Sequence, residues 1–593
     1  MLHTLRLTEF LGDLPKTFIV GLVPFVIGSE TTFKLSSEML NALETALKAI
    51  ETQLNAWGVQ MQRTDHIALE CIAELSYKGF ELAFVFLFKC VNEKTSLNFT
   101  PLLEQMACNL QARFYSVYKD NTTSFYLQAS AETTLEFAQK LSEILPFSLD
   151  FSFLSLKEIT EPLDENLFQT TSLSKPLFMN AKEHQDFLDK NASLYANALG
   201  FVKNAAFKGA IIHSPKELID CLTQLKEMLK TQDFIPIFTS RGALSLSLKN
   251  PSPSVIFSDL SSVLSCTKLP LEDAKYLASL EKPSIKASLK SVFKDTFKND
   301  EIIAQLPFDP ILNLLCRILQ DEGIEFVFIH ESRSCEVLLH YEVLFKTPKR
   351  LITPTKKFVL ENNLSAIAFK DELEFLSTTR NSIVLYFSFK RPTRLLLHAN
   401  GSLKTLLSVS FDFNKMFNAL KQDEKASRML KNYATKFPNF YARILELSKY
   451  QLGGANLLDF FQILGFVLGY SEDFCAQSVI PLAKECLRPK GPRIDYKILK
   501  DDSFKMALNF SKIMHSAMSF RLAGVENEIL SLGILDSLAE FLGNFIWDNA
   551  QNFSVQEVTI AGDFFGEKVF LDLFVRYFPK TLALKAHAFL DYE

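Results

Sequence analysis

The stretch VQEVTIAGDFFGEKVFLDLFVRYFPK, Val555 to Lys580, has the pattern of a buried strand, a tight turn and a helix. Turns between a strand and a helix often use glycines, because glycine reaches positive φ and lets a phosphate approach the backbone at the helix N-terminus. In this turn Gly562 is present, whereas Asp563 occupies the position where a second glycine would be expected. The stretch therefore predicts the scaffold of a phosphate-binding turn with a carboxylate in place of the phosphate.

The elements that precede this turn follow the order of one half of a sugar-kinase or actin-like domain. Strand patterns cover residues 366–389, and a further hairpin is predicted around a turn at Asn400 and Gly401. Apolar residues then recur at helical spacing in four segments, at 456–469, 473–487, 503–523 and 532–550. A strand meander, a group of helices and a final strand-turn-helix together predict the actin-like fold.

The segment 81–160 alternates strands and helices in the order βαββαβ, which predicts a ferredoxin-like sandwich. Strands are expected at 82–90, 113–120, 124–129 and 148–159, helices at 98–112 and 133–145, and a hairpin turn at Asn121 to Thr123.

The segment 161–355 shows a second alternation and predicts an α/β layer structure. Its clearest elements are an amphipathic helix at 217–232, a buried strand at 234–240, and a strand with its following helix at 253–265. Residues 1–80 combine strand-like apolar runs with a predicted helix at 36–57, and we assign no function to them.

The composition is that of a globular protein with several domains. A chain of 593 residues is too long for one core, so roughly three to five domains are expected. The net charge of −5 gives no general attraction to nucleic acid. The short basic clusters KTPKR (346–350) and RPKGPR (488–493) are interpreted as solvated loops. No nucleic-acid partner is therefore expected.

The cysteines and the N-terminus indicate a protein of the cytoplasm. The nine cysteines form no CxxC pair, which leaves zinc knuckles and thioredoxin-like redox sites unsupported. Free thiols suit a reducing compartment. The N-terminus lacks the basic region of a signal peptide, and the apolar run at 17–28 is too short to span a bilayer. We expect cytoplasmic localisation without membrane insertion.

In this order the three units resemble the HypF family, the carbamoyltransferases of nickel-iron hydrogenase maturation. The resemblance extends over about residues 82–593 and rests on the segments 255–288, 306–310, 455–478 and 561–570. It implies an N-terminal segment of unknown role at 1–80, an acylphosphatase-like domain at 81–160, a YrdC-like α/β domain at 161–355 and a TsaD-like carbamoyltransferase domain at 356–593.

The residues that carry chemistry in the family are missing at the matching positions. The acylphosphatase phosphate loop corresponds to 89–103, which contains no glycine and has Thr100 in place of the arginine, while Lys119 lies near the position of the asparagine. The cysteine-rich zinc segment that should follow Ile159 has no cysteine here. Only His398 lies near the position of the HxxxH metal motif.

The two nucleotide-binding turns are also altered. The loop Thr239, Ser240, Arg241, Gly242, Ala243 stands where the YrdC-like family has KGLGG. In the TsaD-like turn, Asp563 replaces a glycine and Glu567 an asparagine, and two acids repel a triphosphate. We expect no catalytic residue and no metal site. Vestigial nucleotide-binding positions are predicted at Thr239, Ser240, Arg241, Gly242, Lys282, Gly562 and Asp563.

These departures favour a non-catalytic relative of HypF, similar to the HydE-type proteins of hydrogenase operons. The resemblance implies binding to a hydrogenase large subunit or to other maturation proteins, with no cofactor. The alternative is an active carbamoyltransferase that uses carbamoyl phosphate and ATP-Mg in cyanide-ligand synthesis. A compact cluster of Arg241, Lys282, Lys286 and Lys290 facing one cavity would support it. A nucleic-acid-modifying protein is disfavoured because the sequence contains no basic stripe.

Overall fold

The computed structural model describes residues 82–585, except 160–164, 173, 182, 184–197, 332–336, 363–380, 400–401 and 501–505. The predictions for residues 1–80 and for the part of the strand pattern at 366–380 lie outside the described residues. The chain divides into two compact units, Met1–Lys349 and Arg350–Glu593.

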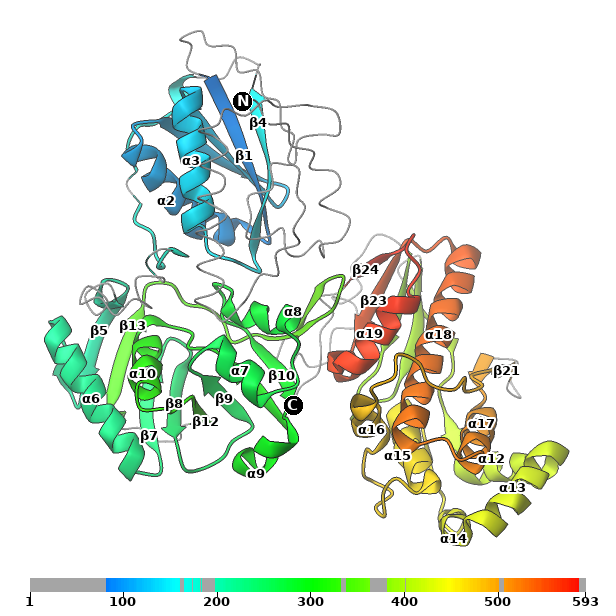
Figure 1. The fold of residues 1–593 in the computed structure, drawn as a ribbon. Coiled ribbons are helices and arrows are strands. Elements are labelled where there is room, and N and C mark those ends of the chain that lie inside the picture. Colours follow the sequence, from blue (N-terminus) through cyan, green and yellow to red (C-terminus); the bar gives the residue numbers. More distant parts are fainter. Residues whose placement is uncertain are drawn as a thin grey trace, which may run out of the picture. The chain divides into compact units, whose positions relative to one another are not determined.

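The first part of unit 1 is a ferredoxin-like sandwich, as the sequence predicted (Figure 1). Its antiparallel sheet has the order β2-β3-β1-β4, and α2 and α3 cover one face (Figure 1). Phenylalanines such as Phe86, Phe99 and Phe125 fill the core between sheet and helices. The elements are β1 (Leu82–Cys90), α2 (Glu93–Asn109), β2 (Arg113–Lys119), β3 (Thr122–Ala129), α3 (Ala131–Ile144) and β4 (Phe151–Ile159).

Two details of this sandwich differ from the prediction. The hairpin turn is formed by Asp120 and Asn121, with φ of 50° and 58°, rather than by Asn121 to Thr123. A two-residue hairpin turn of this type needs two left-handed residues, which Asp and Asn tolerate. Helix α2 begins five residues before the predicted start because Asn92 caps it, accepting a 2.9 Å hydrogen bond from the Thr95 amide.

The second part of unit 1 is the predicted α/β structure. Within unit 1 its mixed sheet runs β10-β11-β9-β12-β8-β7-β13-β5-β6, and the core includes Leu222, Ile237 and Leu315. The elements are η2 (Glu165–Leu167), β5 (Val202–Phe207), β6 (Ala210–Ile211), α6 (Pro215–Thr231), β7 (Ile235–Thr239), β8 (Gly242–Ser247), β9 (Ser254–Phe257), α7 (Leu260–Cys266), α8 (Leu271–Ala274), η3 (Lys275–Ala278), β10 (Ser284–Ser288), η4 (Ser291–Phe293), α9 (Lys294–Phe297), β11 (Glu301–Gln305), α10 (Pro310–Gln320), β12 (Phe326–Glu331) and β13 (Leu339–Val343).

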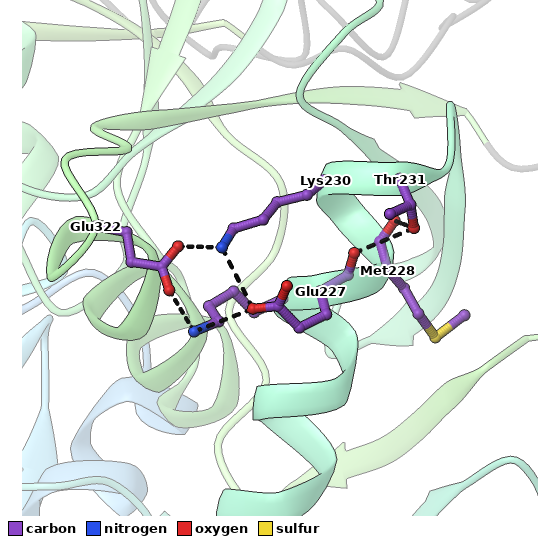
Figure 2. Close-up of polar contacts among 6 residues, drawn as sticks. Glu227, Met228, Lys230, Thr231 and Glu322 are labelled. Atoms are coloured by element: carbon purple, nitrogen blue, oxygen red, sulfur yellow. Dashed lines mark hydrogen bonds and ion pairs between the residues drawn. The ribbon is translucent and has the colours of Figure 1, made fainter.

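Helix α6 packs against α10, and an ion-pair cluster joins them at the rim (Figure 2). Glu322, just after α10, pairs with Lys226 and Lys230 of α6, and Glu227 joins both lysines (Figure 2). Hydrogen bonds from the two lysines lower the pKa of Glu322. Because the cluster is open to solvent, its contribution to stability is small, and the apolar face of α6 provides most of the attachment.

Unit 2 is built around a sheet with the order β18-β17-β16-β23-β24. The hairpin of β17 and β18 confirms the predicted pairing around residues 400–401. Strand β16 lies parallel to β23, the strand that precedes the turn at Gly562. The strands are β14 (Leu351–Pro354), β15 (Val359–Asn362), β16 (Ser382–Tyr386), β17 (Arg394–Ala399), β18 (Ser402–Leu407), β19 (Phe411–Asp412), β20 (Gly453–Gly454), β21 (Ile498–Lys500), β22 (Met506–Leu508), β23 (Glu557–Ala561) and β24 (Ala583–Lys585).

In unit 2, helices α16, α17 and α19 pack against the long helix α18. Of the helices that the structure describes, α18 is the one long and apolar enough to cross a membrane, yet 78% of its apolar window is buried inside the protein, as in the core helix of a globular domain. The helices are α12 (Phe413–Gln422), α13 (Glu424–Lys436), α14 (Pro438–Leu447), α15 (Leu457–Leu468), α16 (Val479–Glu485), α17 (Phe510–Leu522), α18 (Asn527–Phe553), η6 (Asp563–Gly566) and α19 (Lys568–Tyr577).

Two helix predictions in unit 2 were too long. The predicted helix at 473–487 is confined to α16, because the Asp473 carboxylate accepts the Cys475 amide and forms a local turn instead. The predicted helix at 503–523 begins only at Phe510, where Asn509 caps α17, and β22 occupies part of the preceding segment. Helices α12, α13 and α14 were not predicted.

Candidate functional site

The first predicted site lies on the hairpin between β7 and β8 in unit 1. Thr239 ends β7 and Gly242 begins β8 with φ of +96°. The Thr239 hydroxyl donates to the Gly242 carbonyl at 3.1 Å and accepts the Arg241 amide at 3.2 Å. The turn is therefore closed by its own hydrogen bonds.

The Arg241 guanidinium is bound by groups of the protein. Nη2 donates to the backbone carbonyls of Glu281 at 3.0 Å and Lys282 at 2.7 Å, and to the Thr347 hydroxyl at 3.2 Å. Nη1 donates to Gln305 Oε1 at 3.3 Å. The Nη1 and Nη2 groups that could donate hydrogen bonds to a phosphate therefore donate to protein oxygens instead.

The guanidinium also lies over an aromatic ring. The Arg241 Cζ is 4.2 Å from the centre of the Phe308 ring, a cation–π contact. Arginine therefore ties the hairpin to the loop at 281–282 and to the end of β11, which is a structural role.

A buried carboxylate stands beside the same turn. Asp309 caps α10 through the Leu312 amide at 2.9 Å and accepts the hydroxyls of Ser240 at 3.2 Å and Tyr341 at 3.0 Å. Burial raises the pKa of Asp309, while these hydrogen bonds and the charge of Arg241 oppose that rise. The hydroxyl of Ser240 is thus already engaged by an acid.

The four cations that would support an active enzyme bind separate protein groups. Lys282, at φ of 47°, donates to the Ala278 carbonyl at 3.1 Å. Lys286 forms an ion pair with Glu301 at 3.1 Å, and Lys290 donates to the Leu264 carbonyl at 2.7 Å. Arg241 contacts the Lys282 backbone, whereas Lys286 and Lys290 bind other groups. The four cations are therefore not seen to converge on one cavity among the described residues.

Burial lowers the pKa of Lys282 to about 8, with the negative charge of Glu281 opposing the shift and the positive charge of Arg241 adding to it. The charge of Arg241 thus disfavours the charged form of Lys282. The cavity of about 390 Å³ in unit 1 lies at the β5–β6 edge, and none of the predicted site residues lines it.

The second predicted site lies at the carboxyl ends of two parallel strands in unit 2. Ala561, at the end of β23, is opposite Tyr386, at the end of β16. Ligands of α/β folds commonly bind where such strand ends meet. Gly562 has φ of +95°, and a Cβ placed there would lie 2.0 Å from the Phe387 carbonyl oxygen. Glycine is therefore required by close backbone packing.

The Asp563 carboxylate lies inside unit 2, at the carboxyl ends of these strands. Its side chain is buried, and its Oδ1 accepts the backbone amide of Phe389 at 2.8 Å. This amide lies at the ends of the two parallel strands, where ligands of α/β folds commonly bind. The Phe389 amide therefore already donates to the Asp563 carboxylate.

The loop after β16 is fastened on its other side as well. Asn456, the cap of α15, donates from Nδ2 to the Ser388 carbonyl at 3.0 Å. The Thr393 hydroxyl accepts the Leu457 amide at 3.0 Å. Near α19 the buried Glu567 pairs with Lys484 at 2.7 Å. Both acids predicted to repel phosphate thus bind partners inside unit 2.

The remaining predicted positions lie apart from these turns. His398 is buried in β17, and its Nδ1 has no hydrogen-bond partner among the described residues. Thr100 is buried within α2, and Lys119 is exposed at the end of β2. Over the described part of the chain, no group of three or more His, Cys, Asp or Glu residues is arranged to hold a metal ion.

Several partners in these sites were not predicted, namely Gln305, Phe308, Asp309, Phe389 and Asn456. Asp309 carries a visible signal, since an Asp directly before Pro310 is typical of a helix N-cap. The amide of Phe389 has no such signal, because its role depends on the pairing of distant strands.

Comparison with solved structures identifies the fold. HypF of T. kodakarensis aligns with a TM-score of 0.53 and 9% identity over 85% of this chain and 95% of that one. The chain has the fold of HypF. A full-length HypF in a phosphate- and nucleotide-bound form aligns with a TM-score of 0.50 and 9% identity over 84% and 94% of the two chains. The predicted fold class and the predicted likeness to HypF are confirmed.

Two proteins of Wolinella succinogenes are similar in sequence to this HypF-like chain. HydE is 26% identical over 508 residues, which cover 79% of this chain and 92% of HydE. HydD is 50% identical over 80 residues, 14% of this chain, so the match spans half of HydD. The predicted likeness to HydE is thereby confirmed. No family model matches the chain.

Proposed function

We propose that this chain acts in the maturation of a nickel-iron hydrogenase as a non-catalytic, HypF-like assembly protein. The similarity to HydE along most of the chain and the HypF fold support a role in hydrogenase maturation. Fold alone does not determine activity, so the non-catalytic part of the proposal rests on the site.

The observation that carries it is the hydrogen bond from the Phe389 amide to the Asp563 carboxylate. The turn that would bind a nucleotide thus carries an acid of its own, which binds an amide of the loop after β16. The Arg241 guanidinium, which would be the cation of the second site, is likewise engaged by protein oxygens. A nucleotide would have to displace these internal partners, and charge-assisted hydrogen bonds are the stronger ones to break.

The partner in this proposal is a hydrogenase large subunit or another maturation protein, and the compartment is the cytoplasm. No catalytic residue, resident metal or cofactor is required. ATP-Mg would be needed only by the alternative, an active carbamoyltransferase that uses carbamoyl phosphate.

Ligand-dependent thermal melting separates the two functions. The full chain is heated with ATP-Mg or carbamoyl phosphate, and the full-length HypF that binds phosphate and nucleotide is the positive control. A ligand at 100 times its Kd stabilises a protein by about 2.7 kcal/mol, which is easily measured. We expect no shift for this chain and a clear shift for HypF. A shift with both ligands would establish the alternative.

The hydrogenase assignment has its own test. The gene for this chain is deleted in its host, and hydrogenase activity is measured with and without a plasmid-borne copy. We expect activity to fall in the deletion strain and to return with the wild-type copy. It should also return with an Arg241→Lys copy if that protein accumulates, because the proposal gives Arg241 no catalytic role. Full activity in the deletion strain would refute the assignment.

A further inference from the structure

The segment Leu487–Arg493, here called the basic loop, presents cations and one apolar side chain to solvent. Leu487 has a relative exposure of 101%, and Arg488 and Lys490 are also exposed. Among the described residues neither cation forms an ion pair, although Lys490 lies near enough to Asp536 for its charge to oppose the rise in the pKa of that carboxyl. Arg493 approaches Glu540 at 3.6 Å but keeps 77% of its side chain exposed.

The basic loop is irregular but firmly held. A Cβ on Gly491 would lie 2.3 Å from the Gly533 nitrogen, so the loop backbone touches the backbone of α18. The Pro489 carbonyl accepts the Arg576 guanidinium at 3.1 Å, and Ile494, directly after the loop, is buried. A loop that is already ordered loses less conformational entropy when it binds a partner. These anchors argue against a freely moving solvated loop.

The exposed groups define the chemistry of an occupant. We propose that the basic loop is a docking site for an acidic segment of a partner protein, whose carboxylates pair with Arg488 and Lys490 while an apolar side chain packs on Leu487. Complementary charge sets the rate and specificity of such an encounter, and arginine beside an apolar contact is a common interface anchor. This proposal does not depend on the hydrogenase assignment.

A nucleic acid fits the loop less well. Nucleic-acid sites typically neutralise about six to ten phosphates, whereas the loop offers three cations and lies next to the exposed Glu485.

The test is fluorescence anisotropy with a labelled synthetic peptide in which one leucine is flanked by glutamates. The full chain is compared with an Arg488→Glu/Lys490→Glu variant and with Leu487→Ser. The matched control is Lys425→Glu/Lys431→Glu, which reverses two exposed charges on α13. Thermal melting of each variant verifies that it is folded, as expected for exposed positions.

We expect the wild type and the α13 control to bind the peptide alike, with affinity that falls as salt rises. The double reversal should weaken binding at least tenfold, and Leu487→Ser should weaken it by a smaller factor that salt does not change. The proposal is overturned by a wild type that does not bind, by equal losses in the α13 control, or by tighter binding of duplex DNA than of the peptide.

Discussion

Asp563 and Phe389 are 174 positions apart in the sequence, and a 2.8 Å hydrogen bond joins the Asp563 carboxylate to the Phe389 amide. The bond forms because β16 and β23 are parallel neighbours, so the loops that follow them meet at one edge of the sheet. Ligands of α/β folds commonly bind at such an edge. In this chain the Asp563 carboxylate accepts a hydrogen bond from the amide there and so joins the two loops.

Replacing Asp563 should therefore destabilise the protein. Asp563→Ala leaves the part-buried Phe389 amide without this acceptor, which costs about 1–3 kcal/mol. Asp563→Asn keeps an acceptor oxygen and should lose less. Urea unfolding of the full chain measures both. An alanine variant as stable as the wild type would mean that the bond contributes nothing.

Gly562 tests the close packing behind the same turn. Gly562→Ala introduces a Cβ 2.0 Å from the Phe387 carbonyl oxygen at φ of +95°. We expect a loss of about 3 kcal/mol or more, combining left-handed strain with a steric clash.

The matched control is Gly524→Ala, since Gly524 has φ of +85° but nothing within 4 Å of the new Cβ. It should lose only about 1 kcal/mol, the cost of the backbone conformation. Equal losses in the two variants, read from urea midpoints, would show that the clash is relieved.

The sequence alone indicates that the turn at Asp563 is altered, but it does not indicate which group the Asp563 carboxylate binds. Asp563 could be recognised as misplaced because glycine is expected in a strand-turn-helix. Its partner at Phe389 could not, since sequence periodicity contains no information on which distant strands pair. Local competition explains the overlong helix at 473–487, where the Asp473 side chain forms a turn that apolar spacing does not register.

Arg241 should be important for stability and unimportant for nucleotide binding. Arg241→Ala leaves the carbonyls of Glu281 and Lys282 without this donor, and we expect a loss of about 2–4 kcal/mol. Arg241→Lys should recover only part of it, because an ammonium cannot reproduce the planar guanidinium contacts.

The control for Arg241 is Arg428→Ala, an arginine with 75% of its side chain exposed in an i,i+4 pair with Glu424. It should change stability by less than about 0.5 kcal/mol. Urea unfolding gives the stabilities, and melting with ATP-Mg gives the binding. An Arg241→Ala variant with wild-type stability would show that the guanidinium contacts do not stabilise the fold.

Lys282 makes stability depend on pH in the alkaline range. Its pKa is lowered to about 8 from an ordinary 10.5, chiefly by burial. Between these values the unfolded chain binds more protons than the folded one, so the contribution of Lys282 to stability rises with pH through this window. Lys282→Met lacks this titration, and its stability relative to the wild type should fall as pH rises from about 7.5 to about 10. The exposed Lys268→Met is the control and should run parallel to the wild type. If the curve for Lys282→Met also ran parallel to the wild type, the pKa of Lys282 would be ordinary in the folded protein. The inferred effects of burial and of the Arg241 charge on Lys282 would then be wrong.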